Sequence, residues 1–336
     1  MEVGLQNKLE SIQVLRFIAA FSVMMVHLPL LGFGSWGVDI FFVISGFIMM
    51  FVTEKENKFF FIKRLVRIVP LYWCLTILIF VTSVFLPQYL NNTSDNFLHL
   101  IKSLLFIPFD KNGTGHFPVH FLGWSLNFEI IFYLLFASSL FLIKNFRALL
   151  VSILIILFVL ISSFFSDKNF VFSVYSNTII LEFIFGIIIF YIWKKYQGTL
   201  NKSRLYIPTM ILFLLISYLL IIGLFRPEFE HLNYRFIRFG FPSFLLVLYF
   251  ILFLDNFKFP KTLVLLGDSS YSLYLIHPFI IQFFYKVFNF ENSMIGFNHY
   301  LLTLLIVFLV LVFSIITFTK IEKPFNLILK KWLNLK

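Results

Sequence analysis

Apolar runs of about 17–25 residues, the length that spans a bilayer, recur along the whole chain and limit its fold more than any other feature. Of the 336 residues, 60% are hydrophobic and only 13% are charged, so a water-soluble core cannot bury this much apolar surface. We therefore expect an all-α, polytopic membrane protein that forms one membrane domain over residues 1–336. The runs predict about ten transmembrane helices, near 11–31, 37–52, 70–86, 121–143, 149–165, 175–193, 206–224, 236–254, 269–288 and 299–319.

The lysine and arginine residues around these runs indicate the orientation of the chain. With both termini cytoplasmic, 19 of the 27 basic residues lie at the inner side and 7 at the outer side. Lys and Arg in short loops favour the cytoplasmic side, so both termini are expected inside. The formal net charge of +11 then indicates contact with the anionic inner leaflet of the bilayer and no nucleic-acid partner. The longest segment between runs, 87–120, is predicted to be an outer loop.

Arg16 and His27 place two ionisable side chains inside the first apolar run. A charge at the centre of a membrane helix costs roughly 2.5–3.5 kcal/mol, so such residues usually face a protein interior or a cavity. Eleven positions apart on one helix, the two lie within about 20° of one face and about 16 Å apart. His27 could accept a hydroxyl proton, and Arg16 could bind an acyl-CoA phosphate or polarise its thioester. The alternatives are a histidine that packs helices and an arginine that reaches the inner surface.

The second run opens with GVDIFFVISGF (37–47), in which Asp39 lies near the outer end. Its carboxylate could orient His27 and stabilise the protonated imidazole. It could equally cap the second helix, where a negative charge suits the N-terminal end of the helix dipole. Both roles stay open. Ser45 and Gly46 are expected to permit close helix packing, because small residues are common at membrane helix interfaces.

A basic group precedes the third run. Arg64 and Arg67 are three positions apart, so on a helical turn they share one surface, and Lys63 adjoins them. Guanidinium groups suit phosphate oxygens, which favours a site for the phosphates of a coenzyme at the inner surface. The alternative is contact with anionic lipid headgroups.

The segment WSLNFEIIFY (124–133) opens the fourth run from the outside. A carboxylate at Glu129, with Ser125 and Trp124 above it, could bind sugar hydroxyls or share a proton with His27, and the indole could stack on a sugar face. An interfacial position would also explain Trp124, but not Glu129. The same reasoning applies less strongly to Glu182 and to His277, which precedes Pro278 and its expected helix kink.

Two kinds of site are not predicted. His116 and His120 lie in a Gly/Pro-rich segment without a cysteine or acidic partner at helical spacing, so no metal site is expected. The chain also lacks a phosphate-binding glycine loop and a G-x-S-x-G serine motif.

Taken in order, these motifs resemble the integral-membrane acyltransferases of the acyltransferase-three family. The resemblance is carried by Arg16 and His27 with ten residues between them, then by GVDIFFVISGF (37–47), FIKRLVRIVPLYW (61–73), WSLNFEIIFY (124–133), LEFIFG (181–186), GDSSYSLYLIHP (267–278) and IEKPF (321–325). It implies a ten-helix protein of the bacterial inner membrane that O-acetylates lipopolysaccharide, exopolysaccharide, capsule or nodulation-factor sugars with cytoplasmic acetyl-CoA. The chain is similar to the stand-alone form, without an appended periplasmic esterase-like domain.

The sequence therefore predicts a membrane-bound, acyl-CoA-dependent O-acyltransferase whose acceptor is a cell-surface polysaccharide or its lipid-linked precursor. A transporter is the main alternative, because it too needs intramembrane ionisable residues, but no paired halves are visible. A membrane scaffold would leave these residues without a role. The expected catalytic residues are His27, Arg16, Asp39 and Glu129; acetyl-CoA is expected at Lys63, Arg64, Arg67 and Arg16, and the sugar at Trp124, Ser125, Tyr133 and His277.

Overall fold

The computed structural model is built of helices throughout the residues that it describes, with no strand among them. These residues are 2–28, 30–55, 58–90, 93, 95–110, 117–141, 146–196, 235–254, 257–287 and 297–335. The expected run at 206–224 and His116 lie outside them. The chain divides into two compact units, one formed by Met1–Glu56 and Thr178–Tyr274 and the other by Asn57–Asn177 and Leu275–Lys336.

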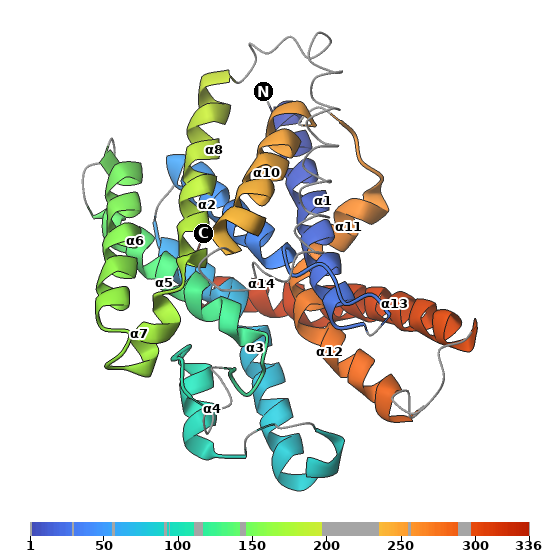
Figure 1. Ribbon diagram of the computed structural model, residues 1–336. Coiled ribbons are helices and arrows are strands. Elements are labelled where there is room, and N and C mark those ends of the chain that lie inside the picture. The colour runs from blue at the N-terminus through green and yellow to red at the C-terminus, as the bar shows by residue number, and fades with distance from the viewer. Residues whose placement is uncertain are drawn as a thin grey trace. The chain divides into compact units, whose positions relative to one another are not determined.

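The first unit is organised around a pair of long apolar helices near the N-terminus, which Figure 1 shows in blue. The second helix of the pair packs most extensively against α8, and the first packs against α2, α10 and α11. The elements are α1 (Glu2–Val26), α2 (Gly37–Lys55), η3 (Thr178–Leu181), α8 (Glu182–Tyr196), the π-helical turn η6 (Phe236–Gly240), α10 (Phe241–Phe253), α11 (Lys261–Asp268) and the start of α12 (Ser270–Val287).

Helices α2 and α8 run in the same direction and touch through glycine. A β-carbon placed on Gly46 would lie 2.1 Å from the Phe183 carbonyl oxygen, so the backbones approach too closely for any side chain there. At the far end of the pair, Lys194 Nζ lies 2.5 Å from Glu54 Oε1. From the Gly46–Phe183 contact to the Glu54–Lys194 contact the residue numbers increase along both helices, as expected for parallel helices. The expected packing role of Gly46 is confirmed.

The turn between α1 and α2 folds back on α1. Gly34 has a φ of +114°, and a β-carbon there would lie 2.2 Å from the Ser22 carbonyl oxygen. Only glycine meets both requirements, the left-handed backbone and the close approach. This turn brings the start of α2, which contains Asp39, beside the C-terminal half of α1, where Gly37 approaches Ala19 and Val23.

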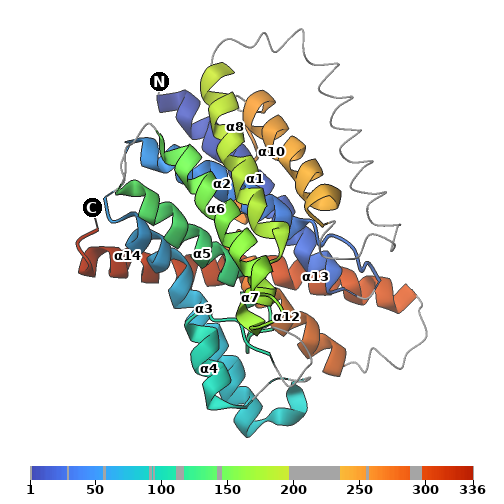
Figure 2. The ribbon, with the colours of Figure 1, turned by 60° about the vertical axis from the view of Figure 1, so that its left-hand side comes forward.

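In the second unit, a long apolar helix, α3, contacts α4, α5 and α14, and α6 contacts both α5 and α7. Figure 2 shows the last two helices, α13 and α14, as successive stretches of one long rod. The elements are α3 (Phe60–Phe85), η1 (Pro87–Tyr89), α4 (Phe97–Leu104), α5 (Gly123–Leu140), α6 (Arg147–Phe164), α7 (Phe170–Tyr175), the rest of α12, α13 (Phe297–Thr317), the π-helical turn η8 (Phe318–Glu322) and α14 (Lys323–Trp332).

The segment expected to be an outer loop contains a short helix, α4, that is fastened to α3. Trp73 Nε1 donates to the Leu104 carbonyl oxygen at 2.9 Å, and Tyr72 Oη donates to the Ser103 carbonyl oxygen at 3.2 Å. The Val119 backbone N–H in turn donates to Ser103 Oγ at 2.9 Å. These bonds satisfy polar groups of the connection and fix the start of α5.

Six described helices are long and apolar enough to cross a membrane, or seven if one bent pair is a single span. They confirm a multi-pass helical protein but not the expected count of ten or the orientation of the termini. The straight candidates are Gly37–Glu54, Phe60–Phe85, Gly123–Leu140, Arg147–Phe164, Phe236–Phe253 and His299–Trp332, and the bent pair is Lys261–Asp268 with Ser270–Val287.

Three boundaries differ from the prediction by several residues. The first helix, α1, ends at Val26 and not near residue 31, and α8 begins at Glu182 although a span was expected from residue 175. The third helix begins at Phe60 and not near residue 70, so the basic group belongs to the membrane helix itself and Pro70 lies inside it. The span expected at 269–288 agrees with α12 to within one residue, and the 72° bend lies at the break between α11 and α12 that precedes it, not at Pro278, which lies within α12.

Candidate active site

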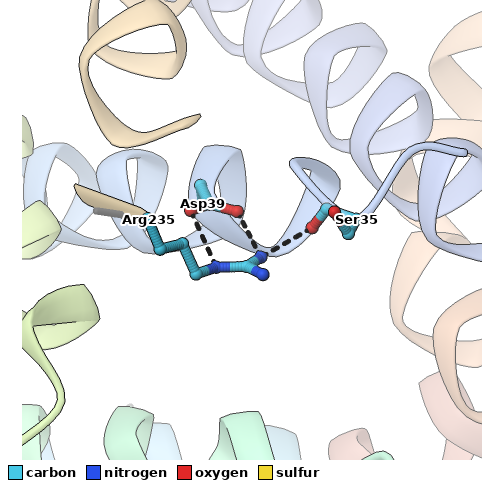
Figure 3. Close-up of polar contacts among 3 residues, drawn as sticks. All are labelled: Ser35, Asp39 and Arg235. Carbon is cyan, nitrogen blue, oxygen red and sulfur yellow. Dashed lines mark hydrogen bonds and ion pairs between the residues drawn. The ribbon is translucent and has the colours of Figure 1, made fainter. Parts of the chain in front are cut away.

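The first unit contains a buried ion pair between α2 and the segment that leads into η6. Arg235 Nε donates to Asp39 Oδ1 at 3.2 Å, and its Nη2 donates to Asp39 Oδ2 at 2.6 Å and to the Ser35 carbonyl oxygen at 2.9 Å (Figure 3). The Asp39 side chain is 0% exposed. A two-pronged guanidinium contact of this kind is among the strongest that a carboxylate can make.

A second carboxylate, that of Glu182, lies beside this pair. Glu182 is the first residue of α8 and is 0% exposed, and its charge acts on both Asp39 and Arg235. Its carboxyl group lies close enough to that of Asp39 for the two to interact directly. A β-carbon on Gly240 would lie only 2.7 Å from Glu182 Oε1, so η6 closes over the carboxyl group. Two buried carboxylates therefore share one guanidinium.

His27 directly follows the last residue of α1 and is half-buried. Its Nδ1 lies 2.8 Å from the Val23 carbonyl oxygen. A carbonyl oxygen only accepts, so Nδ1 carries the hydrogen, and in the neutral ring Nε2 is the nitrogen that can accept a proton. No hydrogen bond joins Asp39 to His27 among the described residues; Asp39 lies in the first turn of α2 and is bound by Arg235.

Arg16 lies within α1 and is 8% exposed. Its Nη1 donates to Gln13 Oε1 at 3.0 Å. Helix α11 packs against α1 at the same level, because a β-carbon on Gly267 would lie 2.1 Å from the Gln13 carbonyl oxygen. The guanidinium is thus bonded within its own helix, in the part of α1 against which α11 packs.

The second unit brings together cations expected at the donor and a carboxylate expected at the acceptor. Lys63, Arg64 and Arg67 lie in the first two turns of α3, and the Arg64 guanidinium lies 5.7 Å from the centre of the Phe60 ring. On α5, Tyr133 Oη donates to Glu129 Oε1. The negative charge of Glu129 attracts the Arg64 guanidinium, whereas the positive charge of Arg67 repels the Arg64 guanidinium.

The remaining predicted residues of the second unit lie on α5 and α12. Trp124 is half-buried and meets Phe128 edge-on, with ring centres 6.2 Å apart. Ser125 is buried, and its Oγ donates to the Leu122 carbonyl oxygen at 3.2 Å. His277 is fully buried on α12, immediately before Pro278.

Three residues of interest had no assigned role in the sequence analysis. Arg235 belongs to none of the quoted motifs and gave no signal beyond its charge. Asn127 lies inside WSLNFEIIFY (124–133), is 1% exposed, and neither of its amide atoms has a described partner. His120 is fully buried, and its Nε2 donates to the Leu275 carbonyl oxygen at 3.0 Å. Burial lowers the pKa of His120 to about 4, so the ring is neutral at physiological pH, and its Nδ1 has no described partner.

Within the described ranges, no group of three His, Cys, Asp or Glu side chains is placed to hold a metal ion.

Comparison with known proteins gives a family match and a similar protein. A family model described as an acyltransferase domain matches residues 9–319. The chain is 33% identical over 260 residues to the exopolysaccharide production protein ExoZ of Rhizobium meliloti (strain 1021), a match that covers 74% of this chain and 77% of that protein. No solved structure matches. Since the family match takes in nearly every helix and both units, the chain belongs to the acyltransferase-three family.

Proposed function

We propose that this protein is an acyl-CoA-dependent O-acyltransferase of the bacterial inner membrane that acetylates an exopolysaccharide or its lipid-linked precursor with cytoplasmic acetyl-CoA. Family membership supports acyl transfer, and multiple membrane helices support a membrane setting. The similarity to a protein named for exopolysaccharide production supports a glycan acceptor. A transporter has no comparable support.

The observation that carries the proposal is the hydrogen bond from His27 Nδ1 to the Val23 carbonyl oxygen. It fixes the ring orientation and makes Nε2 the basic nitrogen of the neutral imidazole. A general base needs this state, because it must accept the proton of the attacking hydroxyl group.

In the proposed reaction the sugar hydroxyl oxygen attacks the thioester carbonyl carbon while its proton passes to His27 Nε2. The carbon–sulfur bond then breaks, the coenzyme leaves as a thiolate, and the imidazolium returns the proton to that sulfur. Arg16, buried within α1, stabilises the negative charge that develops on the thioester oxygen.

The second unit supplies binding groups in this proposal. Arg64, Arg67 and Lys63 bind the donor phosphates at the start of α3. The Glu129–Tyr133 pair, joined by a hydrogen bond, faces the sugar together with Trp124, Ser125 and His277 on α5 and α12.

Transfer by purified protein in liposomes tests the proposal. Wild type should release coenzyme A thiol in proportion to new ester on the glycan, and His27→Gln should be slower by about 10²–10⁴-fold at equal protein level. His99→Gln, a substitution in α4, is the matched control and should keep the wild-type rate. Glycan movement without thiol release would indicate a transporter, and full activity of His27→Gln would exclude His27 as the base.

A further inference from the structure

The last helix, α14, carries basic residues and exposed apolar side chains together. Leu327, Ile328 and Trp332 are exposed by 59%, 62% and 77%, and Lys330 and Lys331 lie in its last turn. Such a composition suits the boundary between lipid and water, where apolar groups enter the acyl chains and lysine stays with the headgroups.

The length of the terminal helical rod agrees with that position. The candidate span His299–Trp332 contains 34 residues. At 1.5 Å per residue it is about 50 Å long, whereas the hydrocarbon core is about 30 Å thick. The rod must therefore extend beyond the core, and the lysine-rich end is the part that suits water and phosphate groups.

Helix α14 packs against α3, the helix that begins with the basic group (Figure 2). The contact brings Lys330 close enough to Arg64, Arg67 and Lys63 for their positive charges to repel one another. Among the described residues, Arg64, Arg67 and Lys330 form no ion pair within 4.0 Å. The packing of α14 on α3 thus gathers basic side chains from two helices, and the positive charges of Arg64, Arg67 and Lys330 repel one another.

We propose that Lys330 on α14 joins Lys63, Arg64 and Arg67 on α3 in one binding site for a phosphate ester. A ligand with several negative charges would offset the repulsion between the four cations, and the two guanidinium groups offer forks that match phosphate oxygens. The proposal rests on the proposed function in one respect: there the ester is the phosphate-bearing half of coenzyme A. An anionic lipid headgroup offers the same chemistry.

Two variants on α14 separate a local site from a general basic surface. Lys330→Gln removes the cation that faces the arginines. The adjacent Lys331→Gln removes an equal charge from the same helical turn, at a position about 100° further round the helix. Lys330→Arg keeps the charge and is the conservative replacement.

The experiment measures coenzyme A binding to the full chain in nanodiscs of zwitterionic phosphatidylcholine. Lys330→Gln should weaken binding about five- to tenfold, Lys331→Gln by less than about twofold, and Lys330→Arg should restore most of the affinity. Dephospho-coenzyme A should show a smaller difference between wild type and Lys330→Gln if Lys330 contacts the 3′-phosphate. Equal affinities of the Lys330→Gln and Lys331→Gln variants would overturn the proposal.

A second arm identifies the source of the phosphate. Native mass spectrometry of protein from discs that contain phosphatidylglycerol counts retained anionic lipids. If Lys330→Gln loses a lipid but keeps its affinity for coenzyme A, the site takes a headgroup and the assignment to the donor is wrong. If wild type binds no coenzyme A at all, the proposed function fails at its donor, and the phosphate site is then decided by whether Lys330→Gln loses a lipid. Normal wild-type binding of coenzyme A that Lys330→Gln leaves unchanged, with no loss of lipid, refutes only the inference.

Discussion

Arg235 and Asp39 are separated by 196 positions in the chain, yet the guanidinium holds both carboxylate oxygens, at 3.2 and 2.6 Å. Glu182 adds a second buried carboxylate to the same cation. The pair links α2 to the start of η6 and makes Arg235 the central charge of the first unit.

Removal of Arg235 should therefore destabilise the protein strongly. In Arg235→Gln the buried carboxylates lose their cation, and breaking a buried pair typically costs about 3–5 kcal/mol. Thermal unfolding in mild detergent should show the loss, and the double variant Arg235→Gln with Asp39→Asn should recover part of it. The exposed pair of Lys194 and Glu54 is the control, because its side chains are 52% and 42% exposed and Lys194→Gln should cost less than about 1 kcal/mol. A small effect at Arg235 would show that the carboxylates tolerate its absence.

The parallel packing of α2 and α8 leads to a topological prediction. Since Glu54 and Lys194 meet at the ends of these helices, both ends must lie on one side of the membrane, and the basic residues around them favour the cytoplasm. Reporter fusions after Lys55 and after Tyr196 should both give a cytoplasmic signal. A fusion at Asp95 should give a periplasmic one. Opposite signals from the first two fusions would contradict the parallel arrangement.

Substitution of Asn127 should show whether its amide binds the acceptor or is simply buried. Its amide has no described partner, and an unsatisfied buried polar group costs about 1–3 kcal/mol, so Asn127→Leu should leave stability unchanged or raise it. If the amide binds the acceptor, the same variant should raise the KM for the glycan about tenfold or more. The control is Ser139→Ala on the same helix, where Ser139 Oγ bonds to the Phe136 carbonyl oxygen. Normal KM in a more stable Asn127→Leu protein would show that the residue only fills space.

His120 should make stability depend on pH. Burial lowers the pKa of His120 to about 4, against about 6.5 in the unfolded chain, so the unfolded state binds the proton more readily. The contribution of the neutral ring is fully present above about pH 6.5 and is lost as the pH falls toward 4. The loss should approach about 3 kcal/mol at the low end of this window. In His120→Gln the unfolding midpoint should fall less between pH 6.5 and 4, and an unchanged pH dependence would mean that other groups cause it.

The helices were largely predictable because a bilayer imposes a simple rule on sequence. Runs of apolar residues predicted α2, α5, α6 and α10 within a few residues. The start of α3 was missed because basic residues resemble a loop in hydropathy, although Lys and Arg are good helix formers. The bend at the α11–α12 break was missed because Pro278, the visible helix breaker, lies elsewhere.

The sequence could single out individual polar residues in apolar runs, but it could not show how they pair. Arg16, His27, Asp39 and Glu129 were singled out because an ionisable side chain inside a membrane is unfavourable in free energy. Such a residue is easily recognised in an apolar run. The partner of Asp39 was not recognised, because Arg235 lies at the edge of a run and pairing across so many positions leaves no local pattern. The position of Lys330 near α3 could not be predicted for a similar reason, because it depends on the packing of α14 against α3, which no short motif encodes.

The order of synthesis gives the Arg235–Asp39 contact a consequence for assembly of the protein. A ribosome delivers Asp39 and then Glu182 to the insertion machinery before Arg235 exists, so both acids enter the membrane without their cation. Until Arg235 is made, the negative charges of these two acids can be neutralised by protonation or stabilised by water or the translocon. A nascent chain released before residue 235 keeps this defect permanently and presents it to membrane proteases, so completion of the first unit is itself a checkpoint on full-length synthesis.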